Sequence, residues 1–151
     1  MTKEIRNAAL RYLQMRDYSK MSLALKLRQK GFVLDEITPL LEQLVEDGLL
    51  NEERFVENYI HYRRGRGFGP ERIALELKAQ GIDKVCIAAQ LDMADNTWLD
   101  SARRIWEKQF KNVKAQDFTS YMKQCQFLQR KGFTREQIDA VIPRHFNTEF
   151  I

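Results

Sequence analysis

The hydrophobic positions of this chain recur with the periodicity of α-helices. Near the N-terminus, apolar residues stand three and four positions apart, which is the spacing of one buried helical face: Ile5, Ala8, Ala9, Tyr12 and Leu13. Further along, Leu23 and Leu27 are one turn apart, and a third group contains Ile37, Leu40, Leu41 and Leu44. No stretch alternates with a period of two, and hairpin-type turn dipeptides are missing. The pattern therefore predicts an all-α fold.

A second pattern shows that the helices belong to a repeat. The segments "LRQKGF" (27–32), "LKAQGI" (77–82) and "LQRKGF" (128–133) share one frame, and their glycines are 50 and 51 residues apart. Six positions after each glycine stands an isoleucine, and ten positions after it stands a leucine or isoleucine. Twelve positions before it stands a residue that is acceptable at a helix N-cap: Ser19, Gly69 or Ser120. Agreement at five offsets in three copies predicts a threefold repeat.

Each copy is interpreted as three helices. The frame glycine is expected to end the middle helix in a left-handed conformation, as Gly31 would in the first copy. Pro70 suits the first position of the second middle helix because its missing N–H would have no partner there. Asn51 is an expected N-cap, and Thr134 with Gln137 forms a capping-box pattern. Val33, at the corresponding place in the first copy, offers no such cap.

The first helices of the later copies also have expected inward faces. In the second copy this face contains Phe55, Tyr59 and Tyr62, and in the third, which opens at Thr97, it contains Trp98, Ala102, Ile105 and Trp106. The predicted repeat boundaries are 1–48, 49–93 and 94–151. Units of this size bury too little surface alone, so neighbours must pack against one another. We expect three tandem three-helix repeats in an elongated or curved array.

Composition narrows the class of protein. With 151 residues, 44% hydrophobic and 30% charged, the chain suits a globular protein. It has no apolar run near the ~20 residues that span a bilayer and no export signal, so we expect a cytoplasmic protein without membrane contact. Cys86 and Cys125 do not form a C-x-x-C motif. They are expected to be buried, reduced thiols.

The chain lacks the residue patterns of a catalytic or metal site. His61 and His145 are its only histidines, and neither has a second ligand at metal-binding spacing. No nucleophile motif or zinc-protease motif occurs. We therefore expect a protein that is not an enzyme and that uses no cofactor or metal.

The segment "RRGRGFGPERI" (63–73) concentrates positive charge at a helix entrance. Its first seven residues contain three arginines and three glycines. Gly65, Gly67 and Gly69 are explained by a reversal between two packed helices, whereas the arginines are not needed for such a turn. Guanidinium groups beside a helix start favour phosphates or carboxylates. From the residues alone, a solvated basic turn and a binding edge both remain open.

The candidate binding residues follow from this cluster and from the charge distribution. The net charge is +4, and residues 101–151 hold ten basic and five acidic side chains. The first candidates for contact with an acidic protein or a DNA backbone are Arg63, Arg64 and Arg66. A second group contains Arg72, Lys78, Arg103 and Arg104.

Taken in order, the motifs of this chain resemble the RecX family of recombination regulators. The matching segments are "YLQMRDYS" (12–19), "LRQKGF", "GLLNEERFVENYI" (48–60), "RGRGFGPERIALELKAQGI" (64–82) and "QFLQRKGF" (126–133). The resemblance implies a monomeric modulator, usually an inhibitor, of the RecA recombinase in DNA repair and the SOS response. Such proteins are built from three-helix tandem repeats and are thought to lie in the groove of the RecA–single-stranded-DNA filament.

Two further function classes stay open beside this one. The first is a stand-alone, sequence-nonspecific DNA-binding protein, because three-helix units resemble helix-turn-helix modules. It predicts salt-sensitive binding to single-stranded or double-stranded DNA without RecA. The second is an enzyme, which would show intrinsic turnover after rigorous purification.

Overall fold

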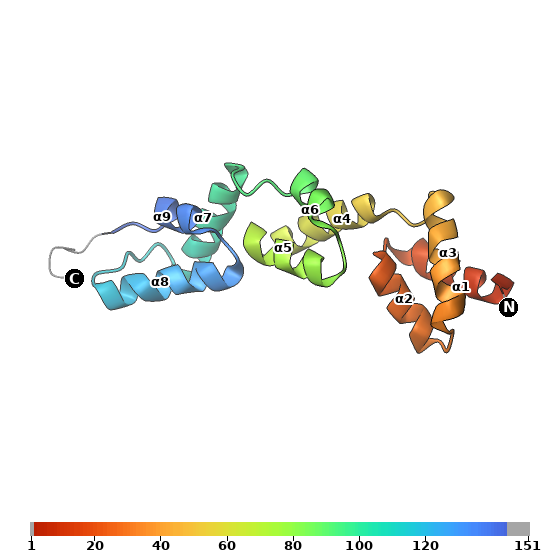
Figure 1. Cartoon of the computed structure of the whole chain (residues 1–151). Helices are drawn as coiled ribbons and strands as arrows, with labels where there is room; N and C mark the ends of the chain where they lie inside the picture. Colours follow the sequence, from red (N-terminus) through yellow and green to blue (C-terminus); the bar gives the residue numbers. More distant parts are fainter. Residues whose placement is uncertain (1, 145–151) are drawn as a thin grey trace. The chain divides into compact units, whose positions relative to one another are not determined.

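The computed structural model describes residues 2–144, and within them the chain forms nine α-helices and no β-strand (Figure 1). The prediction of an all-α fold is therefore confirmed. The helices are α1 (Thr2–Met15), α2 (Lys20–Gln29), α3 (Leu34–Glu46), α4 (Glu52–Gly65), α5 (Pro70–Ala79), α6 (Lys84–Gln90), α7 (Thr97–Phe110), α8 (Phe118–Lys131) and α9 (Arg135–Val141).

The described residues divide into two compact units. The first unit contains residues 2–59 and 77–90, and the second contains residues 60–76 and 91–144. Helices α4 and α5 each contribute to both units. The predicted repeat boundaries and the elongated or curved array stay predictions. No helix in the described part of the chain is both long enough and apolar enough to cross a bilayer.

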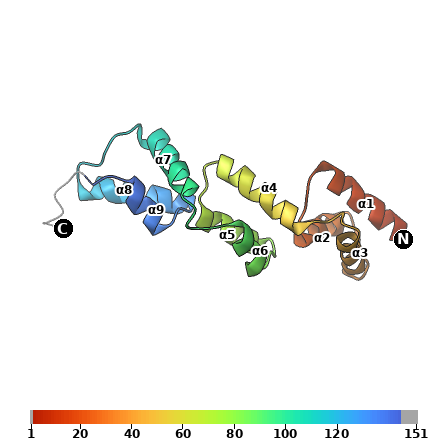
Figure 2. The same ribbon diagram turned by 90° about the horizontal axis from the view of Figure 1, so that it is seen from above.

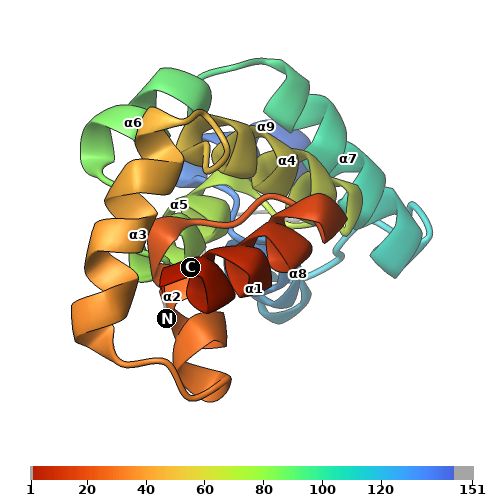
Figure 3. The ribbon, with the colours of Figure 1, turned by 90° about the vertical axis from the view of Figure 1, so that its right-hand side faces the viewer.

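The core of the first unit lies between α1, α2 and α3, which pack against one another (Figure 3). In the predicted inward face of α1, Ile5, Ala8 and Ala9 are buried, and Tyr12 and Leu13 are partly buried against the same core. Each buried leucine or isoleucine contributes roughly 1.5–3 kcal/mol to folding. The predicted apolar positions of α2 and α3 complete this core: Leu23, Leu27, Ile37, Leu40, Leu41 and Leu44.

In the second unit α7, α8 and α9 pack together (Figure 2). Trp98, Ala102 and Trp106 of α7 are buried, as the sequence predicts. The indole Nε1 of Trp106 donates to Oε1 of Gln124 over 2.9 Å, and the same amide donates to the carbonyl of Val113 over 3.0 Å. These bonds satisfy polar groups that the core would otherwise leave without a partner.

Most predicted helix ends are confirmed by their hydrogen bonds. Ser19 forms a capping box with Ser22, and Thr134 forms one with Gln137. Oδ1 of Asn51 accepts from the N–H of Arg54 over 3.0 Å. Val33 precedes α3 without a side-chain cap. Local sequence chemistry therefore sets these ends.

Two local predictions are wrong. Ser120 is not the N-cap of α8, because Asp117 occupies that place and accepts from the N–H of Ser120 over 2.7 Å. Tyr62 does not face inward, since 59% of it is exposed. In that last turn of α4, the more covered positions belong to Arg63 and Arg64, whose guanidinium groups lie over aromatic rings.

The middle helices of the repeat meet end to end at two junctions. The first junction joins the C-terminal end of α5 to the start of α2, where the hydroxyl of Ser19 donates to Oε1 of Gln80 over 3.4 Å. The second junction joins the C-terminal end of α8 to the start of α5. There the N–H of Gly69 donates to the carbonyl of Lys131 over 2.7 Å, and the N–H of Glu71 donates to the carbonyl of Gly132 over 2.8 Å.

The frame glycines end the middle helices as predicted. Gly31, Gly81 and Gly132 have φ values of +101°, +81° and +103°. Residues other than glycine rarely adopt this left-handed conformation. The second junction also depends on glycine for space, because a Cβ on Gly132 would overlap that of Arg72.

Candidate functional site

The glycine-rich turn between α4 and α5 is a helix reversal, as the sequence predicts. Gly67 has a φ of +93°, and a Cβ there would lie 2.8 Å from Cδ1 of Ile105. A Cβ on Gly69 would lie 2.5 Å from the carbonyl carbon of Gly132. Gly65 differs from both, because it ends α4 and a Cβ there would meet no atom within 4 Å.

Arg63 holds this turn together from inside the protein. Its Nε and Nη2 donate to the two carboxylate oxygens of Glu76 over 2.9 and 2.8 Å. Its guanidinium carbon lies 3.9 Å from the centre of the Phe68 ring. Only 19% of the Arg63 side chain is exposed. A bidentate, largely covered pair of this kind is stronger than an ordinary surface ion pair. We therefore assign Arg63 a structural role that the sequence did not indicate.

Arg72 belongs to the same cluster. Its Nε donates to Oε2 of Glu76 over 3.3 Å, and its Nη1 donates to the carbonyl of Arg130 over 3.2 Å. Its guanidinium lies 4.3 Å from the Phe68 ring centre, and the ammonium of Lys131 lies 4.9 Å from it. Three cations thus surround one aromatic ring, next to the contact between α8 and α5.

Arg64 is partly engaged. Its guanidinium carbon lies 4.0 Å from the Trp98 ring centre, and its Nε donates to the hydroxyl of Ser101 over 3.2 Å. Within the described part of the chain, its two terminal nitrogens have no protein acceptor. Arg64 therefore combines a fixed position with N–H groups that remain available.

The other four predicted residues are exposed: Arg66, Lys78, Arg103 and Arg104. None of their side chains makes a hydrogen bond or ion pair with the residues that the structure describes. Lys78 lies in the first unit, and the other three lie in the second. The structure thus separates the seven candidates by whether their side chains have protein partners: Arg63, Arg64 and Arg72 have them, and the other four do not.

A hollow of about 520 Å³ lies between the end of α4 and α7 in the second unit. We call it the basic hollow; it is lined by His61, Arg64, Gly65, Gly67, Ser101, Arg104, Ile105 and Lys108. No acidic side chain is among these residues. Sequence reasoning included Arg64 and Arg104 but missed His61 and Lys108. The four-residue spacing of Arg104 and Lys108, on a helix predicted to start at Thr97, was the available signal.

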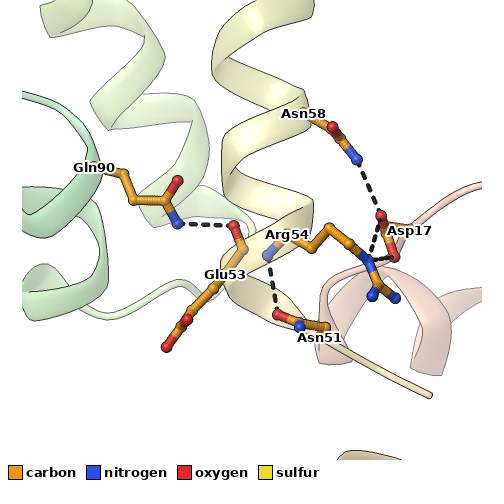
Figure 4. A network of polar contacts seen from close by, with 6 residues as sticks. All are labelled: Asp17, Asn51, Glu53, Arg54, Asn58 and Gln90. Atoms are coloured by element: carbon orange, nitrogen blue, oxygen red, sulfur yellow. Dashed lines mark hydrogen bonds and ion pairs between the residues drawn. The ribbon is translucent and has the colours of Figure 1, made fainter. Parts of the chain in front are cut away.

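The first unit contains a hollow of opposite character. It has a volume of about 660 Å³, and its charged lining residues are Glu53, Arg54, Glu57 and Asp83. Figure 4 shows that Arg54 is held by Asp17, with Nε lying 2.9 and 3.0 Å from the carboxylate oxygens. The charge of Arg54 is thus balanced, and the hollow is acidic.

Cys86 lines this acidic hollow as a free thiol. Cys86 and Cys125 are both only partly buried, so the expectation of buried thiols is wrong. Burial raises its pKa, and the nearby carboxylates of Asp83, Glu53 and Glu52 raise it further. Burial also raises the pKa of the Cys125 thiol in the second unit. Both cysteines therefore favour the protonated form, which is a poor nucleophile.

The described residues contain no metal-binding cluster. Within residues 2–144, no three His, Cys, Asp or Glu side chains gather closely enough to hold an ion. His145 lies outside the described residues.

Comparison with family models gives matches along most of the chain. Residues 6–44 match the model described as "RecX, first three-helix domain". Residues 51–91 match the second three-helix domain, and residues 97–142 match the third. The three matches follow one another in family order, and together they confirm the expected set of three-helix domains.

Curated relatives give the same result. The chain is 40% identical over 139 residues to "Regulatory protein RecX" of Halorhodospira halophila, covering 92% of this chain and 86% of the relative. It is 40% identical over 141 residues to the protein of the same name from Legionella pneumophila, covering 93% of both chains.

Solved structures support the fold. A crystal structure of RecX from Lactobacillus salivarius matches with a TM-score of 0.77 and 24% identity, covering 93% of each chain. A second structure, named as that of regulatory protein RecX, matches with a TM-score of 0.80 and 19% identity, covering 93% of this chain and 72% of the other.

Proposed function

Since this chain belongs to the RecX family of regulatory proteins, we propose that it binds the RecA–single-stranded-DNA filament and lowers ATP turnover and strand exchange. In this proposal it acts without catalysis of its own, as a monomer, in the cytoplasm where the filament forms. Its biological setting would be DNA repair and SOS control.

The match of all three family domains, in order and over most of the chain, is the observation that carries this proposal. Three similar domains on one chain suit a repetitive partner, because several modest contacts on one scaffold add to a high overall affinity. The named relatives are called regulatory proteins, and their names state no partner.

The proposed contact residues are the exposed cations that have no protein partner, rather than the cations that pair within the turn. Arg66, Arg103, Arg104 and Lys78 are open to solvent and can reach an acidic protein surface or a phosphate. Arg63 and Arg72 are engaged with Glu76 and Phe68. Using them for binding would break contacts that hold the turn.

The test is the ATP turnover of RecA on single-stranded DNA with increasing amounts of the purified chain. Substoichiometric protein is expected to depress turnover. No change at stoichiometric protein would remove the proposal. The triple variant Arg66→Ala/Arg103→Ala/Arg104→Ala should inhibit less than the wild type.

A matched control for this variant is Arg11→Ala/Arg28→Ala/Lys30→Ala. It removes the same charge from exposed residues of the first unit. If both variants lose inhibition equally, net charge rather than a defined surface determines binding.

A further inference from the structure

Helix α6 differs from the corresponding helices of the other two copies, because none of its residues is buried. Helix α3 buries four leucine or isoleucine residues, and α9 buries Ile138 and Val141. Around α6 the buried residues are Ile82, which precedes the helix, and Leu91, which follows it. A short helix gains most of its stability from the packing of an apolar face. Within the described residues, α6 is therefore anchored at its two ends, and its body contributes little to the core.

The exposed surface of α6 is apolar at a position where the other copies are acidic. Val85, four positions after the frame glycine, is 80% exposed. The frame places Asp35 and Glu136 at this position in the first and third copies. Ala89 follows Val85 by one helical turn and is also exposed. A single exposed apolar residue is ordinary, but an apolar surface in place of a charged one indicates a contact with another molecule.

This surface forms one wall of the acidic hollow, whose lining residues all belong to the first unit. Val85 and Ala89 line the hollow from α6. Glu53 and Glu57 line it from α4, where they lie one turn apart. The amide Nε2 of Gln90 donates to the carbonyl of Glu53 over 2.7 Å, which holds the end of α6 beside the start of α4 (Figure 4). The hollow thus has an apolar wall and an acidic wall.

The charge of the acidic wall is not balanced within the described part of the chain. The carboxylates of Glu53 and Glu57 make no hydrogen bond or ion pair with the residues that the structure describes. Arg54 is the one cation among the lining residues, and it pairs with Asp17. Like charges one turn apart destabilise a helix. A cationic ligand would relieve this repulsion, whereas a nucleic acid would increase it.

The two walls together fit a protein helix better than a metal ion. Among the described residues, no three His, Cys, Asp or Glu side chains gather closely enough to hold an ion. Glu53 and Glu57 are separated by ~6 Å along the helix axis, which matches two lysines or arginines one turn apart on another helix. The small side chain of Ala89 allows that helix to approach closely. An amphipathic helix in a groove is a common mode of peptide recognition.

We propose that the acidic hollow is a docking site for a basic amphipathic helix of a partner protein. Lysines or arginines of this helix pair with Glu53 and Glu57, and an apolar side chain beside them packs on Val85 and Ala89. This inference goes beyond the proposed regulation of the filament. It assigns the first unit a surface opposite in charge to the exposed cations, and the binding requires neither RecA nor DNA.

The probe is a fluorescein-labelled helical peptide of about 18 leucine, lysine and alanine residues, with its lysines one turn apart. Its fluorescence anisotropy, titrated with the full chain without RecA and DNA, should show saturable binding. A peptide with glutamate in place of each lysine should not bind. Bound lysine peptide should also slow the alkylation of Cys86 by iodoacetamide, because this thiol lines the hollow. Cys125, a free thiol of the second unit, should react at an unchanged rate.

Two neighbouring residues of α6 separate the hollow from its surroundings. Ala89→Lys places a cation in the hollow and should weaken binding of the lysine peptide by about tenfold or more. Ala88→Lys adds the same charge to an exposed residue of α6 that does not line the hollow. It should bind like the wild type. Circular dichroism checks that both variants keep the helical content of the wild type.

The acidic wall is tested by removing its charge. Glu53→Gln/Glu57→Gln should weaken binding about tenfold and reduce its dependence on salt, because two ion pairs with the peptide are lost. The control Glu42→Gln/Glu46→Gln removes the same charge at the same spacing from exposed residues of α3 in the first unit. It should keep both the affinity and the salt dependence.

Equal affinity of Ala89→Lys and Ala88→Lys, or unchanged alkylation of Cys86, would overturn the hollow as the site. A wild-type chain that does not bind the lysine peptide, or that binds the glutamate peptide equally well, would overturn a basic helix as the occupant. Sedimentation velocity of the chain alone tests a second copy: self-association that Ala89→Lys abolishes would overturn a separate partner protein. None of these assays contains RecA, so their failure is distinct from a failure of filament inhibition.

Discussion

The two junctions between middle helices occupy equivalent places in the repeat but are built differently. At the first junction, Ser19 caps its own helix and contacts Gln80 through side-chain atoms. At the second, Gly69 and Gly132 bring two backbones together, and the carbonyls that end α8 accept N–H groups at the start of α5. The comparison shows that equivalent positions of the repeat can be joined either by side-chain hydrogen bonds or by backbone hydrogen bonds. Only the backbone form requires glycine on both sides.

The largest expected effect is at the second junction. Gly132→Ala should destabilise the protein by about 3 kcal/mol, because it combines a left-handed φ with an overlap at Arg72. Gly31→Ala, which has a similar φ and no neighbour within 4 Å, should cost only about 1 kcal/mol. Thermal unfolding followed by circular dichroism measures both. Equal losses would mean that the overlap has no energetic role.

An exchange between the junctions tests the comparison further. Gly69→Ser installs the residue that stands at the first junction. Its Cβ would lie 2.5–2.6 Å from backbone atoms of Gly132 and Phe133, so we expect a loss of about 2 kcal/mol. The reverse change, Ser19→Gly, should cost only a few tenths of a kcal/mol, because glycine is also acceptable at an N-cap. Urea unfolding of the two variants gives this difference directly, and a neutral Gly69→Ser would break the comparison.

The aromatic cluster near the second junction gives the next effect. Arg63→Ala should cost about 2 kcal/mol, since it removes a bidentate bond to Glu76 and the contact with Phe68. Arg66→Ala, three residues away and exposed, should stay within about 0.5 kcal/mol of wild type. Thermal melting of the two single variants checks this ranking. If Arg63→Ala is as stable as the wild type, Arg63 has no structural role and is again a candidate for binding a partner.

The smallest expected effect is a change in stability at acidic pH. Hydrogen bonds from Ser120 lower the pKa of Asp117, the cap of α8, below its ordinary 3.8. The unfolded state then binds protons first as the pH falls, so the stabilisation is present above about pH 4 and is lost as the pH falls through 3.8 toward the lower native value. Asp117→Asn keeps the cap without titration. It should therefore flatten the acid limb of melting temperature against pH, and an unchanged limb would argue against this cap.

The parts of the fold that sequence predicted are those with local causes. The positive φ of Gly31 and the capping box of Thr134 depend on residues within one turn, so their patterns are readable. Asp117 was missed because the residues before α8 lengthen the third copy and move its start to Phe118, ahead of the frame position. The side-chain cap of Asp117, rather than the position expected from the repeat, thus sets the start of α8.

The parts that sequence did not predict depend on distant partners. The helical period predicted that Tyr62 faces inward, because arginine counts as a polar residue in such a pattern. The pattern contains no information about the packing of the Arg63 guanidinium on the Phe68 ring. Glu76, which pairs with Arg63, is thirteen residues away. Likewise, nothing local connects Lys108 with Gly65, although both line the basic hollow.

The most direct test of the regulatory account is cosedimentation of the chain with RecA filaments formed on single-stranded DNA. The account predicts saturable pelleting with the filament, weakened in the Arg66/Arg103/Arg104→Ala variant and retained in the Arg11/Arg28/Lys30→Ala control. A folded wild-type chain that stays in the supernatant at stoichiometric filament would contradict it.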